Sequence, residues 1–447
     1  MARRDCGGKR LVADRVSEPP AGPWAPFRWP DFRSLFGAAF CSTLASRALA
    51  VVLGYEVYAL TGNPLALGML GLIEVIPAVS LALYGGHIAD RRDRRQILRI
   101  TLGALVVCAC ALAAVEASGV GHAKLLLLYG VVFVAGIARG FAEPAAQALE
   151  AQVVPFKILI NSSTLMASCW MSAAVVGPLA GGFSYQHLGA AWTFAGIAVL
   201  YGLAWIATTL IAPRPRPAPP EGESIWQSVA VGVRYVLHDQ ILLGSMSLDL
   251  FAVLFGGAIA MLPIFAKDIL KVDATGLGML NAAPTLGALV AVLFASRRPP
   301  VRHAGRTLFL AVTGFGVAMI VFALSRTFWL SMVALAFSGL FDGLSVVIRR
   351  AINRLFSPDH LRGRIASVST IFIGSSNELG AFESGMMAAW LGTVRSVWVG
   401  GILTLVVVSF AAVMAPKLRK LSLDPSRLSR RDQEIDCELD AEEVASR

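Results

Sequence analysis

The sequence predicts an all-α membrane protein whose twelve transmembrane helices form two six-helix bundles related by a pseudo-two-fold axis. Three observations support this fold class: the length of the apolar runs, the charge of the connectors between them, and a repeat between the two halves of the chain. A helix crosses the hydrocarbon core of a bilayer with about 20 apolar residues. Runs of about this length occupy 34–60, 64–86, 97–118, 123–147, 160–184, 190–212, 241–266, 275–295, 306–325, 328–351, 365–390 and 395–415. The composition agrees, since 56% of the residues are hydrophobic and 15% are charged.

The connectors alternate between arginine-rich and nearly neutral segments. The basic ones are 91–95, 297–306, 349–364 and the two chain ends, and the neutral ones include 61–64, 118–122 and 186–189. Because basic connectors stay in the cytoplasm, we expect both termini on the cytoplasmic side of the membrane and segments 61–64 and 267–273 outside it. Membrane orientation and anionic lipid headgroups then account for the net charge of +10 better than nucleic acid does, and we expect no nucleic-acid partner.

Glycines recur in the second half at an offset of 203 residues. Gly136, Gly140, Gly177 and Gly182 match Gly339, Gly343, Gly380 and Gly385, and the sequence LGML at 67–70 recurs at 277–280 with a slightly larger offset. Six spans separate the copies, an even number, so both halves run the same way through the membrane. Parallel halves of this kind are related by an axis along the membrane normal.

The same pattern divides the chain into five parts. We expect a disordered cytosolic tail and interfacial segment at 1–33, a bundle at 34–212, a cytosolic linker at 213–240, a second bundle at 241–415 and a cytosolic tail at 416–447. The linker opens with the proline-rich sequence PRPRPAPP, which favours a semi-rigid spacer. Apolar residues at helical spacing then predict a surface helix over 225–238.

The connector GHIADRRDRR at 86–95 resembles the major facilitator signature G-x-L-A-D-R-x-G-R-R. The resemblance implies a lock on the cytosolic side, formed by Gly86, Asp90, Arg91, Arg94 and Arg95. Asp90 would lie by the positive amino end of the eleventh span, and Arg94 would seek a carboxylate such as that of Glu150 or Glu143. The alternative is that the arginines only enforce topology.

A second motif, GPLAGG at 177–182, resembles the G-P-x-x-G-G stretch that is frequent in exporters of this superfamily. Gly177, Gly181 and Gly182 permit close helix packing, and Pro178 removes one hydrogen bond of the helix. Ordinary packing is an equally good explanation. Export is favoured only moderately by this motif.

Further stretches resemble the bacterial branch of transmembrane secretion effectors, which includes enterobactin-exporter-like and drug-efflux proteins. The resemblance covers roughly 30–420 and rests on RGF at 139–141, DLF at 249–251, RGR at 362–364 and SNELG at 376–380. It implies a transporter and says little about the cargo.

Charged side chains within the predicted spans are costly and are expected to face a cavity or a partner. They are Arg47, Glu56, Glu74, Arg139, Glu143, Asp249, Asp342, Glu378 and Glu383. Arg47 and Glu56 are nine residues apart, or about 180° around a helix, so they cannot share a face. Glu378 and Glu383 diverge by about 140°, so one of them at most faces a central cavity.

Three of these residues suggest how protons are coupled to transport. Arg139 and Asp342 are equivalent at the 203-residue offset, so symmetric helices would present opposite charges to one cavity. Asp249 and Asp342 each stand in a span without an obvious cation, which makes them candidate proton carriers. Glu143 lies one turn from Arg139, and the two could neutralise each other. A buried structural salt bridge is the alternative role for each residue.

The sequence contains no nucleotide-binding G-x-x-x-x-G-K-[ST] motif, no His/Cys metal set and no nucleophile elbow. We therefore expect no enzyme activity, cofactor or metal. The predicted function is secondary, proton-coupled export of an amphipathic organic molecule: a drug-like compound, a siderophore or a secondary metabolite. The expected partners are this small molecule, protons and the lipid bilayer, with the protein a monomer. An importer of a small nutrient and a non-transporting membrane sensor or scaffold are the alternatives.

Overall fold

The computed structural model describes residues 22–118, 123–213, 225–256, 258–299, 302–358 and 361–423. Within these segments every regular element is a helix. Nine of the described helices are long and apolar enough to cross a membrane. The expectation of an all-α, multi-pass membrane protein is confirmed.

The helices of the first half lie over the predicted apolar runs. They are α1 (Pro30–Thr61), α2 (Pro64–Arg91), α3 (Arg94–Ala117), α4 (Lys124–Val153) and α5 (Leu159–Thr209), preceded by the short η1 (Ala25–Arg28) and interrupted by η2 (Phe156–Ile158). Helix α1 begins before residue 34, so part of the predicted tail is helical. The runs 160–184 and 190–212 share α5, which changes direction at Gly189 with φ 78°. Glycine adopts this left-handed conformation without a steric penalty.

The second half begins with α6 (Ile225–His238), at the predicted bounds of the surface helix. It continues with α7 (Gln240–Phe255), η3 (Ala258–Met261), α8 (Leu262–Ile264), η4 (Phe265–Ile269), α9 (Ala274–Arg297), α10 (Ala304–Leu324), α11 (Phe328–Phe356), α12 (Arg362–Leu391), α13 (Thr393–Met414) and α14 (Pro416–Arg419). The run predicted at 241–266 lies within a candidate membrane span from Gln240 to Ile269, in which α7 ends at Phe255 and shorter helical elements follow. Gly256 follows directly, and Pro263 lacks the backbone N–H that an uninterrupted helix needs.

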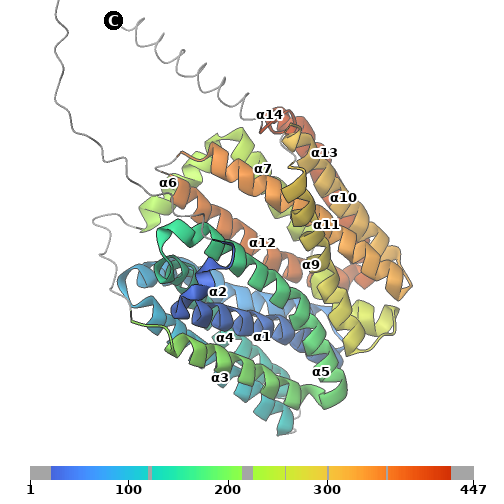
Figure 1. The fold of residues 1–447 in the computed structure, drawn as a ribbon. Helices are drawn as coiled ribbons and strands as arrows, with labels where there is room; N and C mark the ends of the chain where they lie inside the picture. Colours follow the sequence, from blue (N-terminus) through green and yellow to red (C-terminus); the bar gives the residue numbers. More distant parts are fainter. Residues whose placement is uncertain are drawn as a thin grey trace, which may run out of the picture.

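Helices of the same half pack on one another, and the halves meet along two seams. Helix α1 packs on α5 and α2 on α4 in the first half; α9 packs on α11 and α10 on α13 in the second. The seams are α2 with α12 and α5 with α9 (Figure 1). Glycines allow close approach at both, since a Cβ built on Gly68 would lie 3.2 Å from the Cα of Gly385, and one on Gly182 would lie 3.1 Å from that of Gly278.

The buried apolar core is shared by the halves at one end of the described molecule and divided at the other. The largest cluster joins residues of both halves, among them Val57, Phe194, Leu262 and Phe322. Three smaller clusters lie near the opposite helix ends. One contains first-half residues, and the other two contain second-half residues, one of them together with the start of the C-terminal segment. The end with the shared core also carries segment 61–64 and the start of α9.

Candidate functional site

A buried arginine links two carboxylates in the second half. Arg349 of α11 forms an ion pair with Asp249 of α7 through Nη1, and its Nη2 lies 3.7 Å from Oδ1 of Asp342. The side chains of Arg349 and Asp249 are each 10% exposed, whereas that of Asp342 is 45% exposed. Asp249 is therefore the buried member of this Asp–Arg–Asp triad, and Asp342 is its open side.

Helix geometry explains how α11 presents two members of the triad together. Asp342 and Arg349 are seven residues apart, almost two turns, so they project from the same face. Gly343, next to Asp342, packs its backbone against Ala288 of α9. The Nε of Arg349 also donates to the Ser345 carbonyl at 3.4 Å, which aligns the guanidinium along its own helix.

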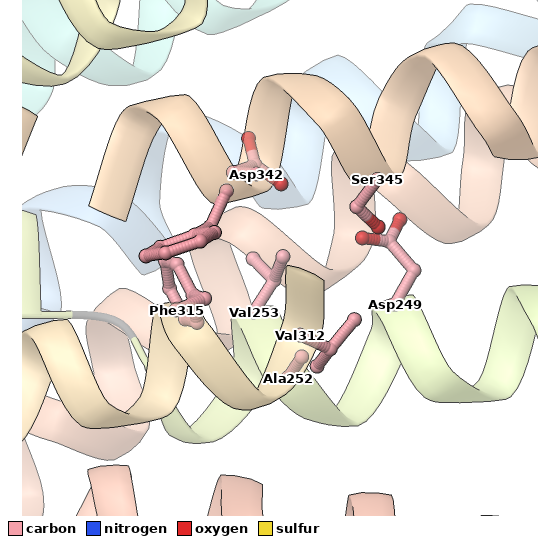
Figure 2. A pocket seen from close by; sticks show the side chains of 8 residues that line it. Asp249, Ala252, Val253, Val312, Phe315, Asp342 and Ser345 are labelled. Carbon is pink, nitrogen blue, oxygen red and sulfur yellow. The ribbon is translucent and has the colours of Figure 1, made fainter. Parts of the chain in front are cut away.

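A small cavity adjoins the triad. Its lining comes from α7, α10 and α11 and comprises Asp249, Ala252, Val253, Val312, Phe315, Phe341, Asp342 and Ser345. Figure 2 shows the Asp249 carboxylate pointing toward α11 beside Ser345, with Phe315 at the other end of the cavity. The volume is about 10 Å³, room for one water molecule at most. This cavity can therefore hold one water molecule beside the carboxylates, but it is too small for an organic cargo.

The triad corrects two sequence-based expectations. Asp249 and Asp342 were expected to lack a nearby cation, and Arg349 was assigned to a cytosolic connector. Helix α11 instead continues to Phe356 and carries Arg349 inside, where it is buried. The positive-inside pattern concealed this residue, because an arginine just inside a helix end and one just outside it look alike in sequence. The seven-residue spacing from Asp342 was the signal that could have found it.

In the first half, Arg139 of α4 forms an ion pair with Glu74 of α2. The side chains are 23% and 28% exposed, so this pair is more open than the Asp249–Arg349 pair. From the sequence, Glu143, one turn away on the same helix, was a candidate partner for Arg139. The close approach of α4 to α2 brings Glu74 within reach instead, because Gly136 packs against the backbone of Glu74.

The remaining sequence-predicted residues lie at several places. Glu383 is half-buried on α12 and accepts from the Ser384 hydroxyl at 3.5 Å, while the Glu378 side chain lies outside the described residues. The side-chain environments of Gly86 and Asp90 are likewise outside the description, and Arg91 is exposed. The proposed inner lock therefore stays a prediction.

Two arginines of the signature bind backbone carbonyls. Arg94 Nη1 donates to the Ala148 carbonyl at 3.1 Å, near the end of α4, and Arg95 Nε donates to the Thr208 carbonyl at 3.4 Å. A cation at the carboxyl end of a helix is favoured by the helix dipole. Arg95 thus fastens α3 to the end of α5, a structural role that the sequence did not indicate.

A second buried polar cluster ties four helices of the first half together. Lys124 of α4 lies 2.7 Å from Glu56 of α1 and 2.8 Å from Glu116 of α3. Tyr185 of α5 donates to Glu56 at 2.5 Å. Glu56, an intramembrane candidate from the sequence, therefore has structural partners at the end of the molecule that holds the shared core.

Comparison with known proteins identifies the class. The transmembrane secretion effector family matches residues 21–444, and the chain belongs to this family. It is also similar to curated transporters named enterobactin exporter EntS. The protein from Shigella flexneri is 22% identical over 408 residues, covering 90% of this chain and 96% of the relative, and one from Escherichia coli (strain SMS-3-5 / SECEC) has the same identity and coverage. The protein is thus a transporter of the major facilitator type and not an enzyme.

Solved structures share the fold at low sequence identity. A POT family transporter in complex with 5-aminolevulinic acid has a TM-score of 0.72 at 11% identity, with 90% of this chain and 98% of that chain covered. A bacterial homolog of the human lysosomal transporter Spinster, in an inward-facing and unoccupied conformation, has a TM-score of 0.70 at 12% identity, covering 87% and 98%. A D-xylose–proton symporter has a TM-score of 0.64 at 14% identity, covering 88% and 98%.

Proposed function

We propose that this protein is a proton-coupled exporter of an amphipathic organic molecule across the bacterial plasma membrane. The observation that carries the proposal is the sharing of Arg349 by Asp249 and Asp342. Two carboxylates and one guanidinium leave one negative charge in excess. A charge held within the membrane is costly, so one proton is taken up to balance the group.

The unequal exposure of the two carboxylates indicates the order of events. Asp342 is the open carboxylate, and Asp249 is held against Arg349 in the interior. A proton that arrives from the space between the two halves therefore binds to Asp342 first. The neutral Asp342 no longer attracts Arg349, which then pairs with Asp249 alone. When the transporter opens to the opposite side of the membrane, Asp342 loses this proton, and Arg349 is again shared by Asp249 and Asp342. Two discrete arrangements of one ionic group can bias the two states of a transporter.

We further propose twelve spans in two bundles related by a pseudo-two-fold axis. The glycine contacts support this proposal. Gly140 packs on Ala78 and Gly343 packs on Ala288, and these pairs are related by offsets of 203 and 210 residues. The same two offsets relate Gly182 to Gly385 and Gly68 to Gly278, so they relate the seam between α5 and α9 to the seam between α2 and α12. An axis that exchanges the halves exchanges one seam for the other.

The orientation also belongs to the proposal. Trp192, Trp329 and Trp390 are 73%, 69% and 79% exposed, and each lies beside a connector that is expected outside. Exposed tryptophans at helix ends are typical of the membrane–water interface. The glycine seams and the shared core lie at this same end. We infer a conformation closed to the outside, in which cargo is loaded from the cytoplasm.

Flux in proteoliposomes with an imposed pH gradient tests the function. Enterobactin and ethidium serve as an anionic and a cationic probe, and Glu143→Gln, at an exposed position of α4, is the matched control. We expect proton-driven accumulation of one probe, lost in Asp249→Asn and Asp342→Asn and kept in the control. Flux that ignores the gradient in the wild-type protein contradicts proton coupling. Movement only in the import direction supports the importer alternative, and no movement of either probe supports a sensor or scaffold.

A further inference from the structure

A buried polar cluster in the first half has the same charge count as the triad; its members are Glu56, Glu116, Lys124 and Tyr185. Lys124 Nζ lies 2.7 Å from Glu56 and 2.8 Å from Glu116, so one ammonium serves two carboxylates. The side chains of Glu56, Glu116 and Lys124 are 7%, 10% and 17% exposed. An excess negative charge at such a place is costly, and the uptake of one proton removes it.

The hydrogen bonds assign this proton to Glu116. Both oxygens of Glu56 accept a hydrogen bond, one from Lys124 and the other from the Tyr185 hydroxyl at 2.5 Å. Lys124 also donates to Oε2 of Glu116 at 2.9 Å, whereas Oε1 of Glu116 is buried and accepts no hydrogen bond from the described residues. Glu56 and Glu116 come within hydrogen-bonding reach of each other. Because ionised carboxylates only accept, such a bond needs a proton, which Glu116 supplies.

Tyr185 connects this cluster to a charged segment of the second half. The centroid of its ring lies 5.0 Å from that of Tyr55, and Tyr55 interacts electrostatically with Asp273, the residue before α9. The same segment carries three further charges, of which the first two contact Tyr58 and the third is exposed: Lys267, Asp268 and Lys271. Asp273 is therefore the charge of the second half that lies toward the cluster.

The cluster also adjoins the seam between α5 and α9. Tyr185 follows Gly182 by three residues, about one turn of α5. Gly182 packs against Ala274 and Gly278 of α9, and Asp273 directly precedes Ala274. An excess negative charge in the cluster repels Asp273 across the closed seam, and separation of the halves at this end relieves the repulsion.

We propose that Glu116, paired with Glu56, is a proton-binding site distinct from the triad, and that its proton favours closure of the seam between α5 and α9. With the proton bound, the cluster is neutral and Asp273 meets no like charge. Release of the proton to water leaves one negative charge in excess and favours opening. The inference goes beyond the proposed export function, because this proton is exchanged at one end of the molecule and is not carried across the membrane.

Infrared difference spectra of the full-length protein in detergent, recorded during a pH titration, detect this proton directly. We expect the carbonyl stretch of a protonated carboxyl group in the wild-type protein and its loss in Glu116→Gln. Glu56→Gln should lose it as well, because Lys124 then neutralises Glu116 alone. The band should persist in Asp342→Asn, which removes a carboxylate of the triad. It should also persist in His122→Gln, a control for the adjoining connector, which lies outside the described residues.

Spin labels at two exposed positions beside the seam, Gln186→Cys and Lys271→Cys, report its closure in a background without other cysteines. As the pH falls, the ratio of closed to open molecules should rise about fivefold or more, the usual size of a coupling between two sites. Glu116→Gln should remain closed throughout the titration. Asp273→Asn keeps a good helix cap and should weaken the response to pH, while the infrared band of Glu116 persists.

Three results overturn the proposal: a Glu116→Gln spectrum that keeps every carboxyl band, a wild-type seam distance that ignores pH, or a Glu116→Gln variant with an unchanged response to pH. Where Glu116→Gln lowers expression, Glu56→Gln tests the same site. Both measurements use no cargo and no gradient, so a failure of proton-coupled export leaves them intact. Conversely, proton-driven flux without the band of Glu116 would preserve the export function and remove this site.

Discussion

Neutralising Arg349 is the sharpest test of the triad. With both side chains only 10% exposed, the Asp249–Arg349 pair is a buried ion pair, and removal of one partner from such a pair costs about 3–5 kcal/mol. We expect Arg349→Gln to lower the free energy of unfolding by about this amount, because Asp249 is left as an uncompensated buried charge. Asp342→Asn should cost about 1 kcal/mol or less, since that side chain is 45% exposed and 3.7 Å from the guanidinium.

The double variant Asp249→Asn/Arg349→Gln makes the prediction specific. With both charges removed, no unpaired ion remains, so most of the stability lost in Arg349→Gln should return. The loss in Arg349→Gln alone should also shrink as the pH falls, because a protonated Asp249 needs no cation. The native state of the Arg349→Gln variant then binds a proton that its unfolded state does not hold, so the stability of this variant rises as the pH falls.

Reversible unfolding in mixed micelles, followed by tryptophan fluorescence during a titration with sodium dodecyl sulfate, measures these differences. Arg350→Gln, at the exposed neighbouring position, is the matched control and should change stability little. Equal losses in Arg349→Gln and Asp342→Asn would refute the reasoning. So would a double variant that is no more stable than Arg349→Gln.

Three other predictions concern topology and the gates. In a background without other cysteines, an external maleimide should label Asn63→Cys and spare Asp93→Cys, and the reverse pattern would contradict the proposed orientation. Asp90→Asn should reduce crosslinking between the cytosolic ends of α2 and α12 several-fold, because a charge at a helix end is worth about 0.3–1 kcal/mol; unchanged crosslinking would leave the residue with a topological role alone. Gly182→Val should separate α5, near its bend at Gly189, from the start of α9, since its Cβ would overlap the Ala274 carbonyl, and spin labels across this seam should show a longer distance; an unchanged distance would argue against a tight seam.

Several features follow from the sequence because their causes are local. A run of apolar residues is stable in a bilayer only as a helix, so the positions of most spans were predictable from composition alone. The helix at 225–238 was likewise predictable from its periodicity. Glycines that recur at one offset identified positions of close helix approach, because only a missing side chain permits such contact.

The partners of the buried charges were decided by the tertiary structure. Arg139 had a candidate partner one turn away in sequence, yet it pairs with Glu74 because α2 and α4 approach closely at Gly136. From the sequence, Arg349 was assigned to a basic connector. In the structure it belongs to α11, where it is buried and pairs with Asp249. An ion pair or cation–π contact depends on distances between helices, and periodicity along one helix carries no information about those distances.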